Sequence, residues 1–183
     1  MKFESLEIAG AYIIHLNPFQ DYRGLFERLF CSEELAEIGL NETVTQVNFS
    51  HSIEKHTLRG LHFQYPPFAE TKIIRCIEGA FFDVIVDIRK DSPTFLEYYS
   101  IELTPDVHQM LFIPKGCAHG FQTLKNDSKM IYFHSEKYTP ESEDGLYYAD
   151  PMLKIDWPHD PTEISEKDKN RTLINHNFKG IEL

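Results

Sequence analysis

Cysteine is scarce in this 183-residue sequence, and its spacing is irregular. Cys31, Cys76 and Cys117 are an odd number of residues at wide separations, and none belongs to a C-x-x-C pair. Disulfide frameworks and structural zinc sites use paired or closely spaced cysteines. The pattern therefore favours free thiols in a cytoplasmic protein.

Long apolar segments are also missing. The most hydrophobic stretch, residues 80–88, contains Asp83 and Asp87 and is far shorter than the roughly 20 residues of a membrane-spanning helix. The first residues, MKFES, are not followed by the apolar run of a secretory signal. We expect a soluble protein with no membrane partner.

Positive net charge is the third absence. Lys and Arg number 18 against 29 Asp and Glu, which gives a formal charge of −11. Nucleic-acid binding normally needs a basic surface, so no nucleic-acid partner is expected. A ligand that carries phosphates would need basic residues gathered locally, because the overall field repels anions.

Aromatic and β-branched residues are abundant instead, with 14 Phe and 9 Tyr. They form short runs separated by turn signals, and this pattern predicts an all-β sandwich or barrel in one domain, residues 1–183. We find no internal repeat and no linker. The predicted strands are 10–16, 25–31, 43–50, 58–64, 70–78, 80–89, 96–103, 109–114, 120–124 and 128–137.

Two short helices are predicted beside these strands. Residues 32–39 offer Ser32 as an N-cap, an acidic first turn and Gly39 as the end. Residues 164–169 offer a second helix with Ser165 as its cap.

Several predicted strands place a polar side chain among apolar ones on the same face. Inside a small barrel an unpaired polar group costs roughly 1–3 kcal/mol, so a polar ligand pocket at the barrel mouth would explain them. A single strand histidine is more often a rim residue or a paired core residue, and that interpretation remains open. The residues concerned are Gln46, Asn48, His62, Lys72, His119 and Tyr132.

An ordered set of motifs runs from about residue 10 to residue 170. They are DYRGLF (21–26), QVNFS (46–50), LRGLHFQ (58–64), VDIRKDSPTF (86–95), IPKGCAHGF (113–121), IDWP (155–158) and SEKD (165–168). With Lys72, Tyr132, Tyr138 and Asp150 between them, they resemble the dTDP-4-dehydrorhamnose 3,5-epimerase family. The resemblance implies a cupin-like jelly roll, or double-stranded β-helix, with short flanking helices.

The resemblance also implies an isomerase that needs neither a cofactor nor a metal. The family substrate is a nucleotide-linked 4-keto-6-deoxyhexose, whose C4 carbonyl acidifies the hydrogens at C3 and C5. Inversion then requires a base on one face, an acid on the other and a group that stabilises the enolate oxygen. Rhamnose supply for polysaccharide biosynthesis is the pathway that the resemblance implies.

Four residues match the family's catalytic positions. The resemblance assigns His62 as the general base, Asp168 as its acidic partner, Tyr132 as the acid and Lys72 as the residue facing the enolate oxygen. Without the family, Asp168 would be interpreted as a solvated charge in the sequence EKDK.

Seven further residues match substrate contacts, and the family pattern implies a homodimer. In the family the N-terminal strand crosses to the second subunit, so Arg23 and Phe26 would serve the partner's site. The matched positions comprise pyrophosphate or sugar contacts (Arg23, Arg59, His119), polar nucleotide contacts (Gln46, Asn48) and aromatic nucleotide contacts (Phe26, Tyr138).

The sequence departs from the family pattern at a few positions. Arg28 stands where the motif D-x-R-G-x-F-x-E has its glutamate, and Glu27 lies one place earlier. A shift of one residue in a strand points the side chain to the other face. Tyr148 replaces a usual Trp and Cys117 a usual Phe. These changes leave the nucleotide and the sugar open.

Three other functions compete with this hypothesis. A related enzyme would invert only C3 or only C5. A metal-dependent cupin would use His62, Glu70 and His119, although Gln64 replaces the second histidine of an H-x-H pair and is a poor transition-metal ligand. A sugar-nucleotide binding module without catalysis would use the same fold.

Overall fold

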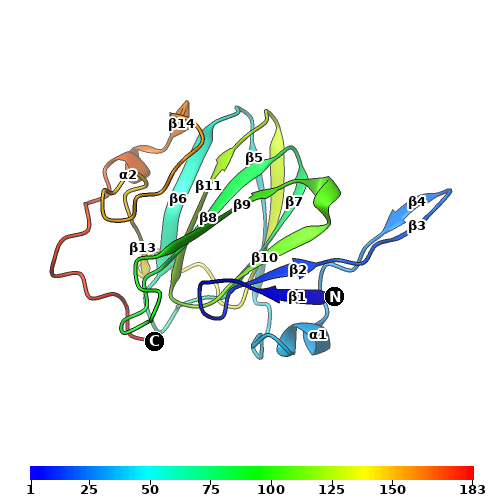
Figure 1. The fold of residues 1–183 in the computed structure, drawn as a ribbon, viewed down its shortest axis with the longest axis horizontal. Helices are drawn as coiled ribbons and strands as arrows, with labels where there is room; N and C mark the ends of the chain where they lie inside the picture. Colours follow the sequence, from blue (N-terminus) through cyan, green and yellow to red (C-terminus); the bar gives the residue numbers. More distant parts are fainter.

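Two β-sheets face each other in the computed structural model, which describes residues 1–183 (Figure 1). The first has the order β1 (Lys2–Ser5), β2 (Tyr12–His15), β10 (Gln109–Ile113), β7 (Lys72–Glu78), β12 (Ser128–His134) and β5 (Gln46–Ser52). The second has β13 (Glu143–Gly145), β6 (Thr57–Gln64), β11 (Cys117–Thr123), β8 (Phe81–Asp87) and β9 (Tyr98–Leu103), with β14 (Glu163–Ile164) parallel to β6. The predicted all-β jelly roll is confirmed.

Apolar side chains fill one end of the space between the sheets. Ile74 and Cys76 of β7 meet Phe81 and Ile85 of β8 there, and the Phe81 and Phe121 rings pack edge to face with centroids 5.1 Å apart. Burial raises the pKa of the Cys76 thiol to about 12. All the cysteines are free, as the sequence predicted.

The outer faces of both sheets are covered as well. The helix α1 (Ser32–Ala36) and the following turn place Leu35, Ile38 and Leu40 against the first sheet. The C-terminal segment covers the second sheet and contributes Leu153 and Ile181, as the orange and red parts of Figure 1 show. Strands that are apolar on both faces are therefore buried on both faces. No helix is long and apolar enough to cross a membrane.

The two helices differ in how well the sequence predicted them. The helix α1 ends at Ala36, three residues before Gly39, and its N-cap is Cys31 without a side-chain hydrogen bond, so Ser32 is not the cap. The helix α2 (Glu166–Lys169) begins as predicted, because the Ser165 hydroxyl accepts a hydrogen bond of 3.1 Å from the Asp168 amide.

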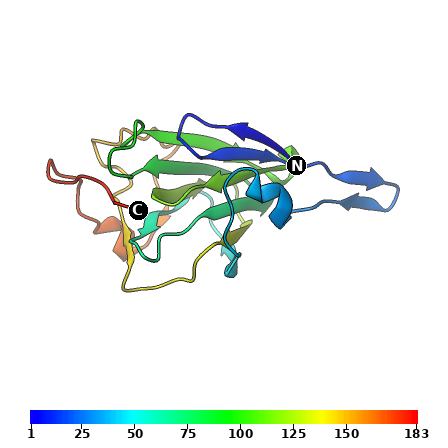
Figure 2. The same cartoon turned by 90° about the horizontal axis from the view of Figure 1, so that it is seen from below.

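The predicted strand at 25–31 is wrong for most of its length. The chain instead forms a hairpin of β3 (Phe19–Asp21) and β4 (Gly24–Phe26) that projects away from both sheets (Figures 1 and 2). A short 3-10 helix, η1 (Pro105–Val107), lies near its base. Glu27 is fixed there by the Arg75 guanidinium at 3.0 Å and by His108 at 2.6 Å, which draws the chain out of strand pairing.

A β-bulge between β6 and β11 determines which side chains of β6 face inward. His119 pairs with His62 but Phe121 pairs with Arg59, so two residues of β6 lie opposite Gly120. Strict alternation would place Arg59 and His62 on opposite faces, yet both line the same cavity. The backbones approach closely, since a Cβ atom at Gly60 would lie 2.5 Å from the Gly120 Cα atom.

We expect Gly60→Ala to lower the free energy of unfolding by about 2–4 kcal/mol, because steric overlap adds to the strain of its positive φ. The matched control is Gly39→Ala, at φ +96 with no atom within 4 Å of the added Cβ, which carries the backbone strain alone. Urea denaturation measures both variants. Equal losses for the two would show that the close approach to Gly120 is unimportant.

Candidate active site

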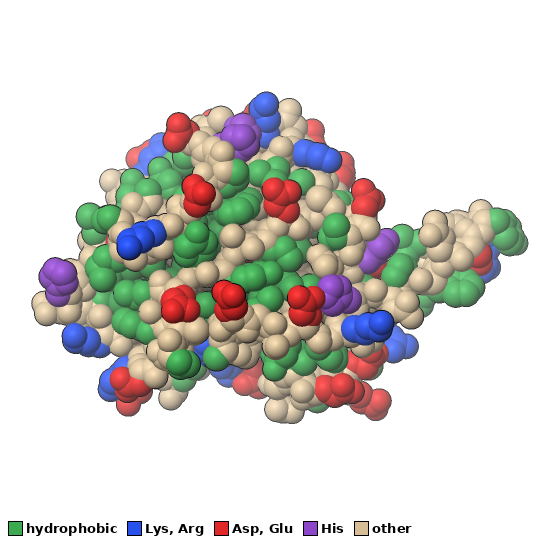
Figure 3. All heavy atoms as spheres, viewed as in Figure 1, with side chains coloured by type: hydrophobic (Ala, Val, Ile, Leu, Met, Phe, Trp, Pro, Cys, Tyr) green, Lys and Arg blue, Asp and Glu red, His purple; other side chains and the backbone are tan.

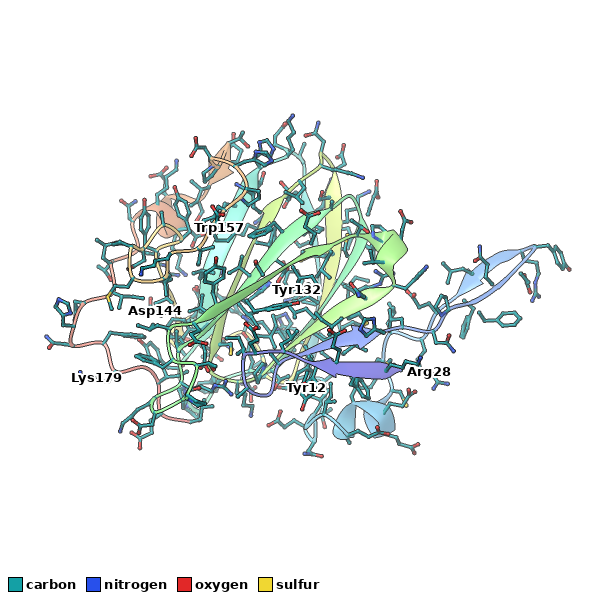
Figure 4. The ribbon with its side chains drawn as sticks, in the orientation of Figure 1. Tyr12, Arg28, Tyr132, Asp144, Trp157 and Lys179 are labelled. Carbon is teal, nitrogen blue, oxygen red and sulfur yellow. The ribbon has the colours of Figure 1, made fainter.

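A cavity of about 850 Å³ occupies the polar end of the space between the sheets. This volume lies within the range of small-molecule sites in proteins. Figure 4 shows Tyr132 near the centre of the barrel, between the two sheets. The cavity brings together eight of the predicted site residues: Asn48, Arg59, His62, Lys72, His119, Tyr132, Tyr138 and Asp168.

His62 and Asp168 form a hydrogen-bonded pair in this cavity. The His62 Nε2 atom lies 2.7 Å from Asp168 Oδ1, and the Asp168 side chain is almost fully buried. Burial by itself would raise the pKa of Asp168, but its hydrogen bonds to His62 and Ser165 bring that pKa below its usual value. The carboxylate therefore stays ionised beside the imidazole.

Asp168 reaches His62 because of the way α2 begins. The Ser165 cap fixes the first turn, and the Gly60 amide lies 3.5 Å from Asp168 Oδ2. The position agrees with the resemblance, whereas interpretation as a solvated charge is wrong.

Tyr132 enters the cavity from β12, in the sheet that faces His62. Its ring stacks on His134 with centroids 5.9 Å apart and meets His119 edge-on at 6.0 Å. Burial raises the pKa of Tyr132 well above its usual range. The phenol is held in its protonated form.

Lys72 supplies a cation on the β7 wall of the cavity. Its ammonium lies 3.1 Å from Glu70 Oε1 and 3.5 Å from the His62 carbonyl oxygen. Glu70 also binds His134 Nδ1 at 2.8 Å. Burial by itself would raise the pKa of Glu70, but the His134 hydrogen bond and the Lys72 charge bring it below its usual value.

His119 has a carboxylate partner of its own. Its Nε2 atom lies 2.9 Å from Asp83 Oδ1, and both side chains are buried. Asp83 Oδ2 has no hydrogen-bond partner. His62, Glu70 and His119, the candidate metal ligands of the cupin alternative, thus each bind a different protein partner.

Three of the predicted binding residues, Asn48, Arg59 and Tyr138, line the cavity and are exposed. The Arg59 Nε–H donates to the Ser52 hydroxyl at 3.3 Å, while the rest of its guanidinium has no protein partner. Gln46 stands behind this surface, because its amide donates to Asn48 Oδ1 at 3.1 Å and accepts from the Tyr138 amide at 3.1 Å. Gln46 thus supports two predicted contacts without lining the cavity itself.

Arg23 and Phe26 do not reach this cavity within one chain. They lie on the projecting hairpin, where Arg23 pairs with Asp21 at 2.6 Å and Phe26 is 75% exposed. Figure 3 shows hydrophobic side chains gathered on this projection.

Sequence reasoning missed two groups of residues around the site. Gln64, considered above only as a poor metal ligand, holds the loop that contains Tyr138, since its amide donates to the Lys137 carbonyl at 3.2 Å and accepts from the Thr139 amide at 2.6 Å. Glu143 lines the mouth and pairs with Lys167 and Arg171. The segment SEDG that contains Glu143 has the composition of a solvated turn, so no sequence signal marks it.

The arrangement suits proton transfer at carbon. A paired imidazole and a protonated phenol extend from facing sheets, and a lysine lies next to the imidazole strand. The fold and site together define a jelly-roll protein with the groups of a proton-transferring enzyme.

Comparison with known proteins identifies the family. Residues 5–176 match the sequence profile of the dTDP-4-dehydrorhamnose 3,5-epimerases, and the chain belongs to this family. A dTDP-4-dehydrorhamnose 3,5-epimerase of Sinorhizobium fredii is 42% identical over 95% of this chain and 90% of its own length.

Solved structures agree with the sequence comparison. The Bacillus anthracis enzyme, with TDP and PPi bound, has a TM-score of 0.91 at 38% identity and covers 94% of this chain and 99% of its own. The Legionella pneumophila enzyme, in complex with dTDP-4-keto-L-rhamnose, has a TM-score of 0.89 at 36% identity and covers 94% of this chain and 92% of its own.

We expect the phenol of Tyr132 to stay protonated at pH values where an ordinary tyrosine, with a pKa of 10.0, ionises. The ultraviolet absorbance of tyrosinate measures this. Alkaline titrations of the wild type and of Tyr132→Phe should overlay until the protein unfolds. Tyr138→Phe is the matched control, since it removes an exposed phenol. A smaller absorbance change in Tyr132→Phe near pH 10 would contradict the expectation.

Proposed function

We propose that this protein epimerises C3 and C5 of a nucleotide-linked 4-keto-6-deoxyhexose. The preferred reaction converts dTDP-4-dehydro-6-deoxy-D-glucose to dTDP-4-dehydro-L-rhamnose. The observation that carries the proposal is the His62–Asp168 pair at 2.7 Å in a cavity that Tyr132 enters from the facing sheet. Membership of the epimerase family supports the same reaction.

His62 is the base in this mechanism. Its Nε2 atom is engaged by Asp168, so Nδ1 is the nitrogen that takes the proton from C3 or C5. The buried carboxylate orients the ring and stabilises the imidazolium that forms. Asp168 is therefore a positioning residue for the base.

Tyr132 and Lys72 complete the cycle. The electron pair left at carbon moves onto the C4 oxygen, where the Lys72 ammonium stabilises the enolate. When the carbonyl re-forms, the Tyr132 hydroxyl gives its proton to the opposite face of the same carbon, and this inverts the centre. The phenolate then regains a proton from solvent, and the imidazolium releases the one it took.

The nucleotide occupies the mouth of the cavity in this proposal. The Arg59 guanidinium and His119 contact the pyrophosphate or sugar, and the fork geometry of arginine suits phosphate oxygens. Asn48 and Tyr138 contact the nucleoside. The Arg59 guanidinium supplies the local positive charge that a chain of net charge −11 needs for an anionic substrate.

The functional unit in this proposal is a homodimer that exchanges the β3–β4 hairpin. The hairpin projects with Phe19 64% and Phe26 75% exposed. The edge strand β5, beside the cavity mouth, exposes Phe49 by 61%. Apolar surfaces of this kind mark protein contacts. Exchange would bring Arg23 and Phe26 to the partner's cavity, and the free cysteines favour a reducing, cytoplasmic location.

The first test incubates the protein with dTDP-4-keto-6-deoxyglucose in heavy water and follows C3 and C5 by proton NMR. Deuterium should enter at both carbons. His62→Ala should lose exchange at both, because the base is gone. Tyr132→Phe should keep exchange while inversion falls by about 100-fold or more, since only the acid is lost. Asp168→Asn should slow exchange without unfolding the protein.

Other outcomes of this experiment distinguish the alternatives. Exchange at one carbon would indicate a single-centre epimerase. If the folded protein shows no hydrogen exchange, its substrate is another nucleotide sugar. The first variants to make would then be Arg28→Glu and Tyr148→Trp, which restore the family's residues. Tightly bound stoichiometric metal would favour the cupin alternative, and wild-type exchange in His62→Ala would refute the role of His62.

Subunit complementation tests the exchanged hairpin. We expect Arg23→Ala and His62→Ala to be nearly inactive separately, because each destroys one half of every site. After unfolding and refolding together, random pairing should restore about a quarter of the sites, each with His62 from one chain and Arg23 from the other. A mixture no more active than its separate components would contradict hairpin exchange. Co-refolding each variant with itself is the control.

A further inference from the structure

Arg171 lies behind the His62–Asp168 pair and binds two carboxylates of β13. Its Nη1 atom is 2.6 Å from Asp144 Oδ1 and its Nη2 atom is 2.9 Å from Glu143 Oε1. The side chain is only 10% exposed, so the guanidinium is held inside the protein. Charge-assisted bonds of this geometry are strong and directional.

The backbone of β13 is shaped to receive this guanidinium. A Cβ atom at Gly145 would lie 2.9 Å from the Cζ and Nε atoms of Arg171. Gly145 pairs with His62 in the sheet register, so the same glycine that admits Arg171 lies next to the base. The contact between the C-terminal segment and the site is therefore closely packed.

The third guanidinium nitrogen of Arg171, Nε, faces the His62–Asp168 pair. Its Nε atom is buried, has no hydrogen-bond partner and lies 4.0 Å from Asp168 Oδ1, the oxygen that binds His62. One guanidinium is thus shared among three carboxylates. A buried polar group without a partner is rare in folded proteins and calls for an explanation.

The charges around His62 come from several elements. Carboxylates are among them: burial by itself would raise the pKa of Glu143, but its hydrogen bond to Lys167 and the positive charges around it bring that pKa below its usual value. The titratable and charged groups that face this region are Asp168 and Lys167 of α2, Glu143 and Asp144 of β13, Arg171 beyond α2, Lys72 of β7 and His119 of β11.

We propose that Arg171 is a positioning residue that holds Asp168 and the β13 carboxylates in place behind His62 and offsets their negative charge. Asp168 alone would both orient the imidazole and favour its protonation. Arg171 counters the second effect while preserving the first. The reaction that uses the base rests on the proposed function, whereas the effect on the ring does not.

A purely structural role for Arg171 makes a different prediction. If the residue only fastened the C-terminal segment, its loss would lower stability without moving the pH at which His62 titrates. Loss of a nearby positive charge instead favours the protonated imidazole, because the remaining field is more negative. The midpoint of the His62 titration would then move to higher pH.

The test compares Arg171→Met, Arg171→Gln and Arg171→Lys. NMR follows the ring protons of His62, assigned by their loss in His62→Gln. The midpoint should rise by about half to one pH unit in Arg171→Met and Arg171→Gln, and stay near the wild-type midpoint in Arg171→Lys, which keeps the charge. Lys169→Met is the matched control, because it removes an exposed cation of α2 that pairs with Glu166.

Exchange of the substrate hydrogens in heavy water gives a second readout. The acid limb of its pH–rate profile should move with the NMR midpoint, so that the rate in Arg171→Met falls by about 3- to 10-fold at pH values below the wild-type midpoint. Circular dichroism and thermal unfolding establish that each variant is folded. If Arg171→Met does not fold, Arg171→Gln and Arg171→Lys make the same comparison.

Two results would overturn the proposal: unchanged midpoints in the folded neutral variants, or an equal rise in Arg171→Lys. Failure of the proposed function has a different signature. The wild type would then leave the dTDP sugar unexchanged, while the NMR titration of His62 would still report the effect of Arg171.

Discussion

The close approach of β6 and β11 is the constraint on which the site depends. Gly60 and Gly120 lie against each other where the register of the two strands shifts, and neither position has space for a Cβ atom. The extra residue in β6 turns Arg59 towards the cavity that His62 already faces. The strand β6 thus carries both His62 and Arg59 into the cavity, on either side of one bulge.

Buried charge in the cavity follows a simple rule. His62, His119 and Lys72 each have a carboxylate within hydrogen-bond distance, in Asp168, Asp83 and Glu70. Pairing offsets the desolvation that would otherwise exclude charged groups from a barrel interior. Arg59 differs, because a serine hydroxyl is its protein partner. Arg59 is therefore the cation of this cavity that has no carboxylate partner and can pair with an anionic ligand.

Much of the fold could be predicted because apolar runs mark strands that are buried on both faces. β7 and β8 carry such runs, and their observed ranges lie within the predicted ones, whereas β11 contains His119, Gly120 and Gln122 and begins three residues before the predicted strand. The polar pocket was one interpretation of His62 in β6, Lys72 in β7 and Tyr132 in β12, and the family resemblance favoured it. Non-local contacts set the limits. β13 has the sequence EDG and forms a strand through its pairing with β6 and its bonds to Arg171, and nothing local in SEKD indicates that Asp168 meets a histidine 106 residues earlier.

The hairpin base shows that non-local contacts can also prevent a strand that the local sequence predicts. Residues 25–31 have the composition of a strand, but the ion pairs of Glu27 with Arg75 and His108 draw the chain to the edge of the barrel. Arg28, which departs from the family motif, turns to Glu34 of α1 at 2.7 Å. Glu27, one residue before the family's glutamate position, and Arg28, at that position, thus each have their own ion-pair partners at the hairpin base.

The distribution of the thiols has a practical consequence. Burial raises the pKa of the Cys117 thiol to about 12, as it does for Cys76, so neither offers a thiolate to alkylating reagents in the folded protein. Cys31 is partly exposed and lies between the hairpin and α1. A maleimide dye would therefore label the native chain at a single position, close to the exposed β3–β4 hairpin.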